Sequence, residues 1–265
     1  MKDPQNNSNL WALVIGGSSG LGLATAKKFA QCGYHVCIVH RDRRTEMSSI
    51  DMHFEEIRSY GNKLIAFNMD AGNEEKQTAF IHSIKNEKIA DIKFDALIFS
   101  IAKGNLKPMV SDDGHALKVS DFKITIDYMA ICLYAWVKNL FQHNLFTKNA
   151  SIISYTSEGN QRAWPNYAAV SAAKAALEAI TRNIALEFAI FGLRANCIQA
   201  GITDTPSLRM IPGYEDLIKH AIQRNPSHRL TMPEDVADAA YLLCCSDAHW
   251  INGAVIPVDG GERIA

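Results

Sequence analysis

The sequence predicts an α/β fold: a single, parallel, doubly wound sheet of about seven strands with helices on both faces. Short apolar runs alternate with helical patterns along the whole chain, as in folds whose strands are joined by helical crossovers. The runs are apolar at nearly every position, which is typical of strands that are covered on both sides. No proline- or glycine-rich linker, low-complexity block or internal repeat interrupts the 265 residues. One domain is therefore expected.

Seven apolar runs mark the expected strands, at Trp11–Ile15, His35–Val39, Leu64–Phe67, Ala96–Phe99, Ser151–Ser154, Ala195–Ile198 and Ala254–Val258. Two of the intervening helices are marked by apolar residues three or four positions apart, at Ile50, Phe54 and Ile57 and at Ala176, Ile180, Ile184 and Phe188. The polar start of the chain has no apolar run behind a basic end. We therefore expect a flexible tail over residues 1–9 and one domain over residues 10–265.

The composition argues against several classes of function. A formal net charge of −1 gives no electrostatic reason to expect a nucleic-acid partner. The longest apolar stretch, around Met129 to Val137, is too short to cross a bilayer, so no membrane partner is expected. The 6 cysteines form no Cys-x-x-Cys pair and have no histidine at metal-ligand spacing, so no metal site is expected. A reduced, cytoplasmic protein fits these features.

The first expected strand runs directly into the segment Gly16-Gly17-Ser18-Ser19-Gly20-Leu21-Gly22, and a helical pattern follows. Glycines at this point let the backbone turn tightly and approach a pyrophosphate, and the helix N-terminus offers N–H groups and the positive end of its dipole. A tight turn without a ligand is the alternative. We expect a Rossmann domain in which a dinucleotide contacts Gly16, Ser18, Ser19, Gly20 and Leu21.

The spacing of these glycines, three residues and then one, resembles that of the short-chain dehydrogenase/reductase family of nicotinamide-dependent oxidoreductases. One departure precedes the loop, since the family normally has threonine where this chain has Ile15. The resemblance extends from about Leu10 to Gly261 and is densest between Ser154 and Thr205.

The resemblance also indicates how the cofactor would be selected. The selecting position falls near His40, which is followed by Arg41 and Asp42. A guanidinium group here can pair with the 2′-phosphate of NADPH, whereas a carboxylate would accept hydrogen bonds from the ribose of NADH. Arg41 favours NADPH, and Asp42 leaves NADH as the alternative. By the same resemblance, further cofactor contacts are expected at Asp70, Ala71, Ser100, Ile101 and Ala102.

The segment from Ala163 to Lys174 is the most informative about the reaction. Ordinary members of the family place a tyrosine four residues before the lysine, but this chain has Val170 there, which has no proton to donate. The nearest tyrosine is Tyr167, seven residues before Lys174. On an ideal helix this spacing is about two turns and about 10.5 Å of rise, so both side chains lie on nearly the same face.

That spacing resembles the enoyl-acyl carrier protein reductases, the fatty-acid-synthesis branch of the family. The resemblance implies that the Tyr167 hydroxyl binds the oxygen of a trans-2-enoyl thioester while hydride goes to the β-carbon. A donor aimed at the developing enolate oxygen would stabilise the transition state. Lys174 would hold the nicotinamide ribose and add positive charge. Within the branch, the chain most resembles the NADPH-dependent subgroup that combines an ordinary glycine loop with this Tyr–Lys spacing.

Other positions bear on this assignment by resemblance. The branch has a second tyrosine at the end of the fifth strand, close to the acyl chain, which predicts a catalytic position for Tyr155. An Ala-Gly pair and a threonine four residues later follow the sixth strand, so Gly201, Ile202 and Thr205 are expected at the cofactor. Asp127 stands where the ordinary family has a helix asparagine that supports a proton relay, which weakens a ketone-reductase interpretation.

The segment from Pro206 to Arg229 is expected to cover the substrate. Its apolar residues are candidates for an acyl-chain groove, namely Leu208, Met210, Ile211, Leu217 and Ile218. Its basic residues are candidates for steering an acidic acyl carrier protein, with solvated surface charge as the alternative: Arg209, Lys219, His220, Arg224, His228 and Arg229. The C-terminal strand resembles one that lies near a tetramer contact in the family, so a homotetramer is expected.

The leading hypothesis is NADPH-preferring reduction of a trans-2-enoyl thioester. The second is a carbonyl or alcohol oxidoreductase that uses Tyr167 in an altered geometry. The third is a non-catalytic protein that senses NADPH, because Ile15, Val170 and Asp127 depart from the family pattern.

Overall fold

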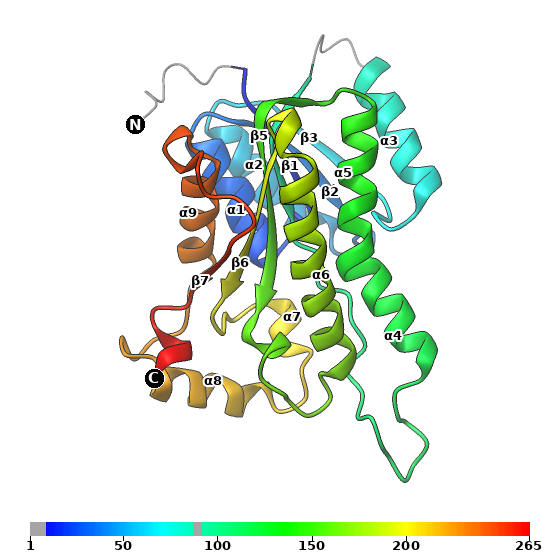
Figure 1. Ribbon diagram of the computed structural model, residues 1–265, viewed down its shortest axis with the longest axis vertical. Helices are drawn as coiled ribbons and strands as arrows, with labels where there is room; N and C mark the ends of the chain where they lie inside the picture. Colours follow the sequence, from blue (N-terminus) through cyan, green and yellow to red (C-terminus); the bar gives the residue numbers. More distant parts are fainter. Residues whose placement is uncertain (1–8, 87–91) are drawn as a thin grey trace.

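The computed structural model describes residues 9–86 and 92–265, and its centre is a parallel sheet of seven strands (Figure 1). The sheet has the order β3-β2-β1-β4-β5-β6-β7, so the chain winds outward from β1 in both directions. This confirms the doubly wound parallel sheet predicted from the sequence. The strands are β1 (Trp11–Ile15), β2 (His35–His40), β3 (Leu64–Asn68), β4 (Phe94–Phe99), β5 (Phe146–Ser157), β6 (Arg194–Ala200) and β7 (Val255–Val258).

The helices cover both faces of the sheet (Figure 1). They are α1 (Gly20–Gln31), α2 (Met47–Ser59), α3 (Glu74–Asn86), α4 (Val119–Ile126), α5 (Cys132–Gln142), α6 (Ala168–Glu187), α7 (Pro206–Arg209), α8 (Tyr214–Arg224) and α9 (Pro233–Cys244). α1, α2 and α9 cover one face, and α3 to α6 cover the other. α7 and α8 lie at the lower end of Figure 1, below the carboxyl ends of the strands.

Alternate side chains of each strand supply two separate apolar layers. On β1, Leu13 packs in the layer that holds Trp136 of α5, while Val14 packs in the layer that holds Phe29 of α1. All four side chains are fully buried. Because successive residues of a strand point to opposite faces, apolar residues at every position are what a sheet covered on both sides requires.

β5 extends beyond the predicted run Ser151–Ser154 at both ends, to Phe146 and to Ser157, and its polar side chains have partners on α6. Ser154 bonds the Thr181 hydroxyl of α6 at 3.1 Å, and Thr156 donates to Glu178 of α6 at 2.8 Å. Partners on a neighbouring helix remove the cost of burying these hydroxyl groups. The extension carries the end of β5 to the functional site.

The predicted helix faces are present, with one shift. Ile50, Phe54 and Ile57 are the buried residues of α2, as predicted. On α6, Ile184 is buried, whereas Ala176 and Ile180 are only partly buried at the edge of the same apolar layer.

Residues 1–8 of the expected tail lie outside the described residues. In the part of the chain that the structure does describe, no helix is long and apolar enough to cross a membrane. No disulfide joins any of the 6 cysteines, all of which lie in that part.

Candidate active site

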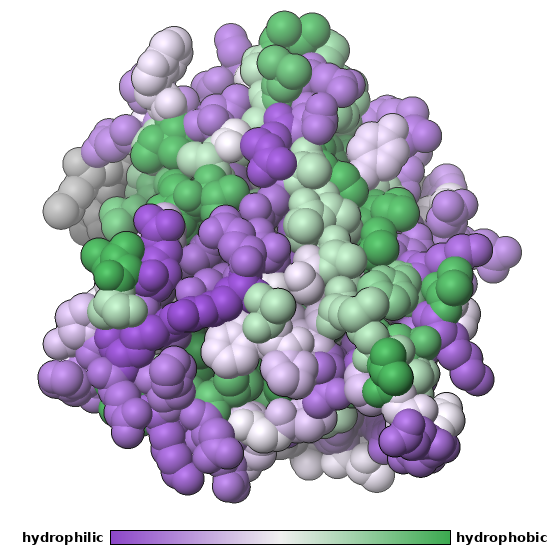
Figure 2. Space-filling view, turned by 60° about the horizontal axis from the view of Figure 1, so that its bottom comes forward, coloured by the Kyte–Doolittle hydropathy of each residue, from purple (hydrophilic) through white to green (hydrophobic). Residues whose placement is uncertain are grey.

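A cavity of about 1090 Å³ lies at the carboxyl ends of the strands. Doubly wound sheets bind their ligands at this edge. Figure 2 shows this end of the molecule, where hydrophilic and hydrophobic side chains are interleaved. Every residue that the sequence placed at the cofactor or in catalysis lines this cavity: Gly16, Ser18, Ser19, Gly20, Leu21, Arg41, Asp70, Ala71, Ser100, Ile101, Ala102, Tyr155, Tyr167, Lys174, Gly201, Ile202 and Thr205.

The glycine loop between β1 and α1 is packed so closely that it has no room for side chains. Gly16 has a φ of +87°, and a Cβ there would lie 2.5 Å from the carbonyl oxygen of Ser100. A Cβ on Gly22 would lie 2.1 Å from the carbonyl oxygen of Gly16. Ser19 is the N-cap of α1, and its side chain makes no capping hydrogen bond. The first N–H groups of α1 are therefore available to a phosphate, and the loop fits a dinucleotide.

A charged cluster lies where the sequence placed the adenosine end of the cofactor. Asp70 accepts hydrogen bonds from Arg41 Nη1 at 2.5 Å, the Tyr128 hydroxyl at 3.0 Å and the Gly72 N–H at 3.0 Å. Lys103 Nζ lies 3.4 Å from the centroid of the Tyr128 ring. Burial alone would raise the pKa of Asp70, but these hydrogen bonds and the two nearby cations lower it below its ordinary value. Asp70 is therefore held as a carboxylate beside Arg41.

Arg41 and Asp42, which bear on cofactor choice, both line the cavity. The Arg41 side chain is 61% exposed, so its guanidinium group remains accessible. The Asp42 carboxylate lies 2.7 Å from Nδ1 of His40 and is only 22% exposed. Arg41 is thus the more accessible of the two charges.

Lys174 of α6 is buried, and its Nζ donates to the carbonyl oxygen of Tyr155 at 2.5 Å. Burial lowers the pKa of Lys174 from 10.5 to about 8, while the nearby Cys197 and Glu178 act in the opposite direction. Glu178 is itself held by Thr156 at 2.8 Å. The ammonium group is therefore fixed at the carboxyl end of β5.

Tyr167 is the N-cap residue of α6. Its ring packs directly on Gly159, where a Cβ would lie 2.5 Å from the ring. Its hydroxyl lies 3.3 Å from the Ser157 hydroxyl. Burial raises the pKa of Tyr167 above its ordinary value, so the hydroxyl keeps its proton and can donate it in a hydrogen bond.

The Tyr155 side chain does not lie where the sequence placed it. Thr156 faces α6, so the preceding residue of the strand faces the opposite side of the sheet. The Tyr155 hydroxyl lies 2.6 Å from Thr25 Oγ1 of α1, in the apolar core. Only the backbone carbonyl of Tyr155 joins the site, as the acceptor for Lys174. The structure therefore brings Tyr167 and Lys174 together without the Tyr155 hydroxyl.

Val170 occupies the position four residues before Lys174, and it is a packing residue. It forms a small buried cluster with Met129 and Ala173. A Cβ on Gly104 would lie 2.3 Å from Cγ2 of Val170, so the valine fits closely under the segment that follows β4.

Asp127, which stands where the ordinary family has its relay asparagine, is exposed and is not part of the cavity lining. A π-helical turn over Asp127–Ile131 joins α4 to α5. Met129, two residues later in this turn, lines the cavity instead. The cavity therefore meets a thioether at this place rather than a carboxylate.

The segment between β6 and α9 covers one end of the cavity. Its lining residues include Leu208, Met210, Ile211 and Leu217, as expected, but not Ile218. Four cations of this segment are paired with carboxylates: Arg209 with Asp204, Lys219 with Asp216, Arg224 with Glu158 and Glu262, and Arg229 with Asp235. This pairing reduces the local positive charge, and with it the argument for steering an acidic carrier protein.

Three of these residues form what we call the Arg224 clasp: Glu158, Arg224 and Glu262. The Arg224 side chain is 8% exposed, and its Nη2 lies 2.6 Å from Glu158 and 2.7 Å from Glu262. Glu262 also accepts a hydrogen bond from the Ile202 N–H at 3.0 Å. The clasp therefore ties the covering helix α8 to the end of β5, to the cofactor segment after β6 and to the C-terminal turn.

Sequence analysis missed Ser157, Lys103 and Tyr128. A polar residue at the carboxyl end of a buried strand is a signal for ligand contact, and it could have indicated Ser157. Lys103 follows the segment that was assigned to the cofactor, but nothing in the sequence pairs it with Tyr128. That contact depends on how the segment after β4 packs against the turn between α4 and α5.

A glycine loop built for a dinucleotide, with Tyr167 and the buried Lys174 lining the same cavity, defines a Rossmann-fold oxidoreductase dependent on NAD(P)H. A family model described as enoyl-(acyl carrier protein) reductase matches residues 16–262. The chain belongs to the short-chain dehydrogenase/reductase family, in its enoyl-acyl carrier protein reductase branch.

The names of individual relatives indicate different reactions. The chain is 28% identical over 252 residues to the cis-4-hydroxycyclohexanecarboxylate dehydrogenase of Sinomonas cyclohexanicum, covering 94% of this chain and 95% of that protein. It is 28% identical over 255 residues to a probable 2,4-dienoyl-CoA reductase of Bacillus subtilis, with the same coverage. The crystal structure of an enoyl-[acyl-carrier-protein] reductase (NADH) from Aquifex aeolicus matches with a TM-score of 0.84 at 25% identity, covering 98% of both chains.

Proposed function

We propose that the protein reduces trans-2-enoyl thioesters, delivered on an acyl carrier protein, to saturated acyl thioesters and prefers NADPH. The position of Tyr167 carries this proposal: it is a partly buried donor at the N-cap of α6, while Val170 fills the position four residues before Lys174. In enoyl reduction, charge develops on an oxygen two atoms away from the carbon that receives hydride. In ketone reduction, the oxygen is on that carbon. A donor placed further from Lys174 suits the first reaction.

A bound nicotinamide cofactor would supply the hydride. The glycine loop would hold its pyrophosphate, and Lys174 would hold its ribose hydroxyls. Tyr167 would donate a hydrogen bond to the thioester oxygen and so stabilise the negative charge that develops there as the β-carbon is reduced. The α-carbon then takes a proton from solvent, which completes the saturated product. The apolar side chains of the covering segment would exclude water from the acyl chain.

The direct test is NADPH oxidation by the purified protein with a short trans-2-enoyl thioester, beside a panel of ketones. The proposal expects oxidation with the thioester and none with the ketones. Activity on a ketone with none on the thioester would assign the protein to the carbonyl oxidoreductases. Tight NADPH binding without turnover on any substrate would instead support the sensor hypothesis.

The carbonyl oxidoreductase remains the second candidate because of Ser157. Its hydroxyl lies 3.3 Å from that of Tyr167, so two hydroxyl groups converge where a carbonyl oxygen could bind. The dehydrogenase named above is also a relative over nearly the whole chain.

The preference for NADPH rests on the exposed guanidinium of Arg41. Arg41→Gln should lower the ratio of kcat/KM for NADPH to that for NADH by about tenfold or more, since a charge-assisted contact with the 2′-phosphate is lost. Arg58→Gln is the matched control, because Arg58 pairs with Glu55 at 2.6 Å on the surface of α2. An unchanged ratio in Arg41→Gln would favour NADH as the cofactor.

We also propose a cytoplasmic homotetramer, as the family resemblance implies. Light scattering coupled to gel filtration tests the oligomeric state of the purified chain.

A further inference from the structure

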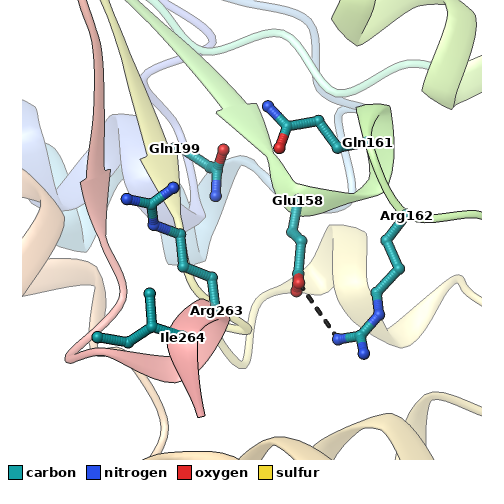
Figure 3. Close-up of a pocket in the computed structure, with 6 residues that line it drawn as sticks. All are labelled: Glu158, Gln161, Arg162, Gln199, Arg263 and Ile264. Atoms are coloured by element: carbon teal, nitrogen blue, oxygen red, sulfur yellow. Dashed lines mark hydrogen bonds and ion pairs between the residues drawn. The ribbon is translucent and has the colours of Figure 1, made fainter.

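A second, smaller pocket adjoins the main cavity and has no role in the proposed reaction. Its volume is about 250 Å³. Figure 3 shows its lining, which comes from the turn after β5, from β6 and from the C-terminal turn: Glu158, Gln161, Arg162, Gln199, Arg263 and Ile264. Glu158, Gln199 and Arg263 also line the main cavity, so the two spaces are neighbours. We call this space the side pocket.

Gln199 gives the side pocket an accessible polar group. The residue is 3% exposed, and within the described part of the chain no hydrogen bond joins its carboxamide to another group. Figure 3 shows the carboxamide directed into the pocket, toward the side chains of Gln161 and Arg263. Neither carboxamide atom is fully enclosed, so both are open to a ligand that enters the pocket.

The side pocket also has an excess of positive charge. Arg263 donates its backbone N–H to Asp259 at 3.2 Å, but among the described residues its guanidinium has no partner. Arg162 contacts Glu158 at 3.2 Å and is 50% exposed. The residues that line the pocket carry two guanidinium groups, on Arg162 and Arg263, and one carboxylate, on Glu158. One positive charge is left over.

We propose that the side pocket binds a carboxylate at the far end of the acyl substrate, an inference that rests on the proposed function. One carboxylate matches the single excess charge, whereas a phosphate monoester carries about −1.5 to −2. Guanidinium and carboxamide N–H groups are the donors that a carboxylate requires. The side pocket also adjoins the Tyr167 end of the main cavity, since Glu158 lines both spaces. Glu158 directly follows Ser157, whose hydroxyl lies 3.3 Å from that of Tyr167. The phosphate of a pantetheine thioester lies at the end of a longer arm.

The test compares two trans-2-enoyl thioesters of coenzyme A that have the same chain length, one ending in a methyl group and the other in a carboxylate. We expect kcat/KM to favour the carboxylate by about tenfold or more, because hydrogen bonds to a charged group contribute at least a factor of this size. Arg263→Gln and Arg162→Gln should each bring the ratio close to one. Arg58→Gln, a surface arginine outside both cavities, should keep the wild-type ratio.

The outcomes separate this inference from the proposed function. If the methyl-ended thioester is reduced and the carboxylate gives no advantage, the inference is wrong and the proposed function stands. If neither thioester is reduced, calorimetric titration with glutarate tests the pocket by itself. Binding to the wild type that is lost in Arg263→Gln supports the carboxylate site without the reductase activity. No binding to the wild type overturns the site as well.

Discussion

The two ends of the main cavity are built by different means. At the cofactor end, Gly16 and Gly22 bring backbone segments so close that the site depends on the absence of side-chain atoms. At the substrate end, buried side chains from distant segments meet, as in the Arg224 clasp and around Lys174. The comparison teaches that the cofactor end should be disrupted by substitutions that add side-chain volume. The substrate end should be disrupted by substitutions that remove a buried charge.

The largest effect should come from opening the clasp. Arg224→Met leaves Glu158 and Glu262 without their buried cation, so the free energy of unfolding should fall by about 3–5 kcal/mol. Urea unfolding measures this change. Arg209→Met is the control, since Arg209 is 63% exposed and pairs with Asp204 at the surface. That variant should lose less than about 1 kcal/mol. If both variants lost the same free energy of unfolding, the buried charges of the clasp would contribute no more to stability than a surface ion pair.

At the cofactor end, Gly16→Ala should lower the free energy of unfolding by about 2–4 kcal/mol, from left-handed strain and from the clash with Ser100. NADPH binding should weaken at the same time, because the loop must move. Gly61→Ala is the matched control: Gly61 has a φ of +86°, but a Cβ there meets no atom within 4 Å. Strain alone should cost it about 1–2 kcal/mol, with NADPH binding intact. If both variants weakened NADPH binding equally, the close packing around Gly16 would not be what the cofactor site depends on.

Lys174 links the two ends, and its ionisation should be visible in the pH profile. Its pKa of about 8 means that the ammonium form is lost as pH rises through that value. The kcat/KM for NADPH, which reports ionisations of the free enzyme, should therefore fall by about tenfold per pH unit above pH 8. Lys174→Arg should move this fall to a higher pH. A flat profile for the wild type across about pH 7 to 9 would contradict a role for the charge.

The smallest effect should come from Tyr155, whose hydroxyl bonds Thr25 on the far side of the sheet. Tyr155→Phe should lower the free energy of unfolding by about 1 kcal/mol, the net value of one hydrogen bond, and should leave turnover unchanged. Thermal unfolding and a turnover assay measure the two quantities. A large loss of turnover would return Tyr155 to the catalytic set.

The cofactor end could be predicted from the sequence because its residues act locally. The glycine loop is one continuous segment, and its fit to a dinucleotide depends on backbone shape. The Tyr167–Lys174 spacing is also local, since one helix and its N-cap carry both residues.

The substrate end could not be predicted in the same way. The partners in the Arg224 clasp are 66 and 38 residues apart in the chain. The direction of the Tyr155 side chain was missed because a strand that is apolar on both faces has no alternating pattern. Without that pattern, the sequence does not show which residues point to which face of the sheet. The π-helical turn that begins at Asp127 could not be predicted either, because sequence periodicity does not reveal such a turn.

The most direct test of the account is the turnover of Tyr167→Phe with NADPH and a trans-2-enoyl thioester. Removing one preorganised donor to the developing enolate should lower kcat by about 10²–10³, while the Kd for NADPH stays at the wild-type value. Wild-type turnover in this variant, or a parallel loss of NADPH affinity, would contradict the claim that the Tyr167 hydroxyl is the catalytic donor.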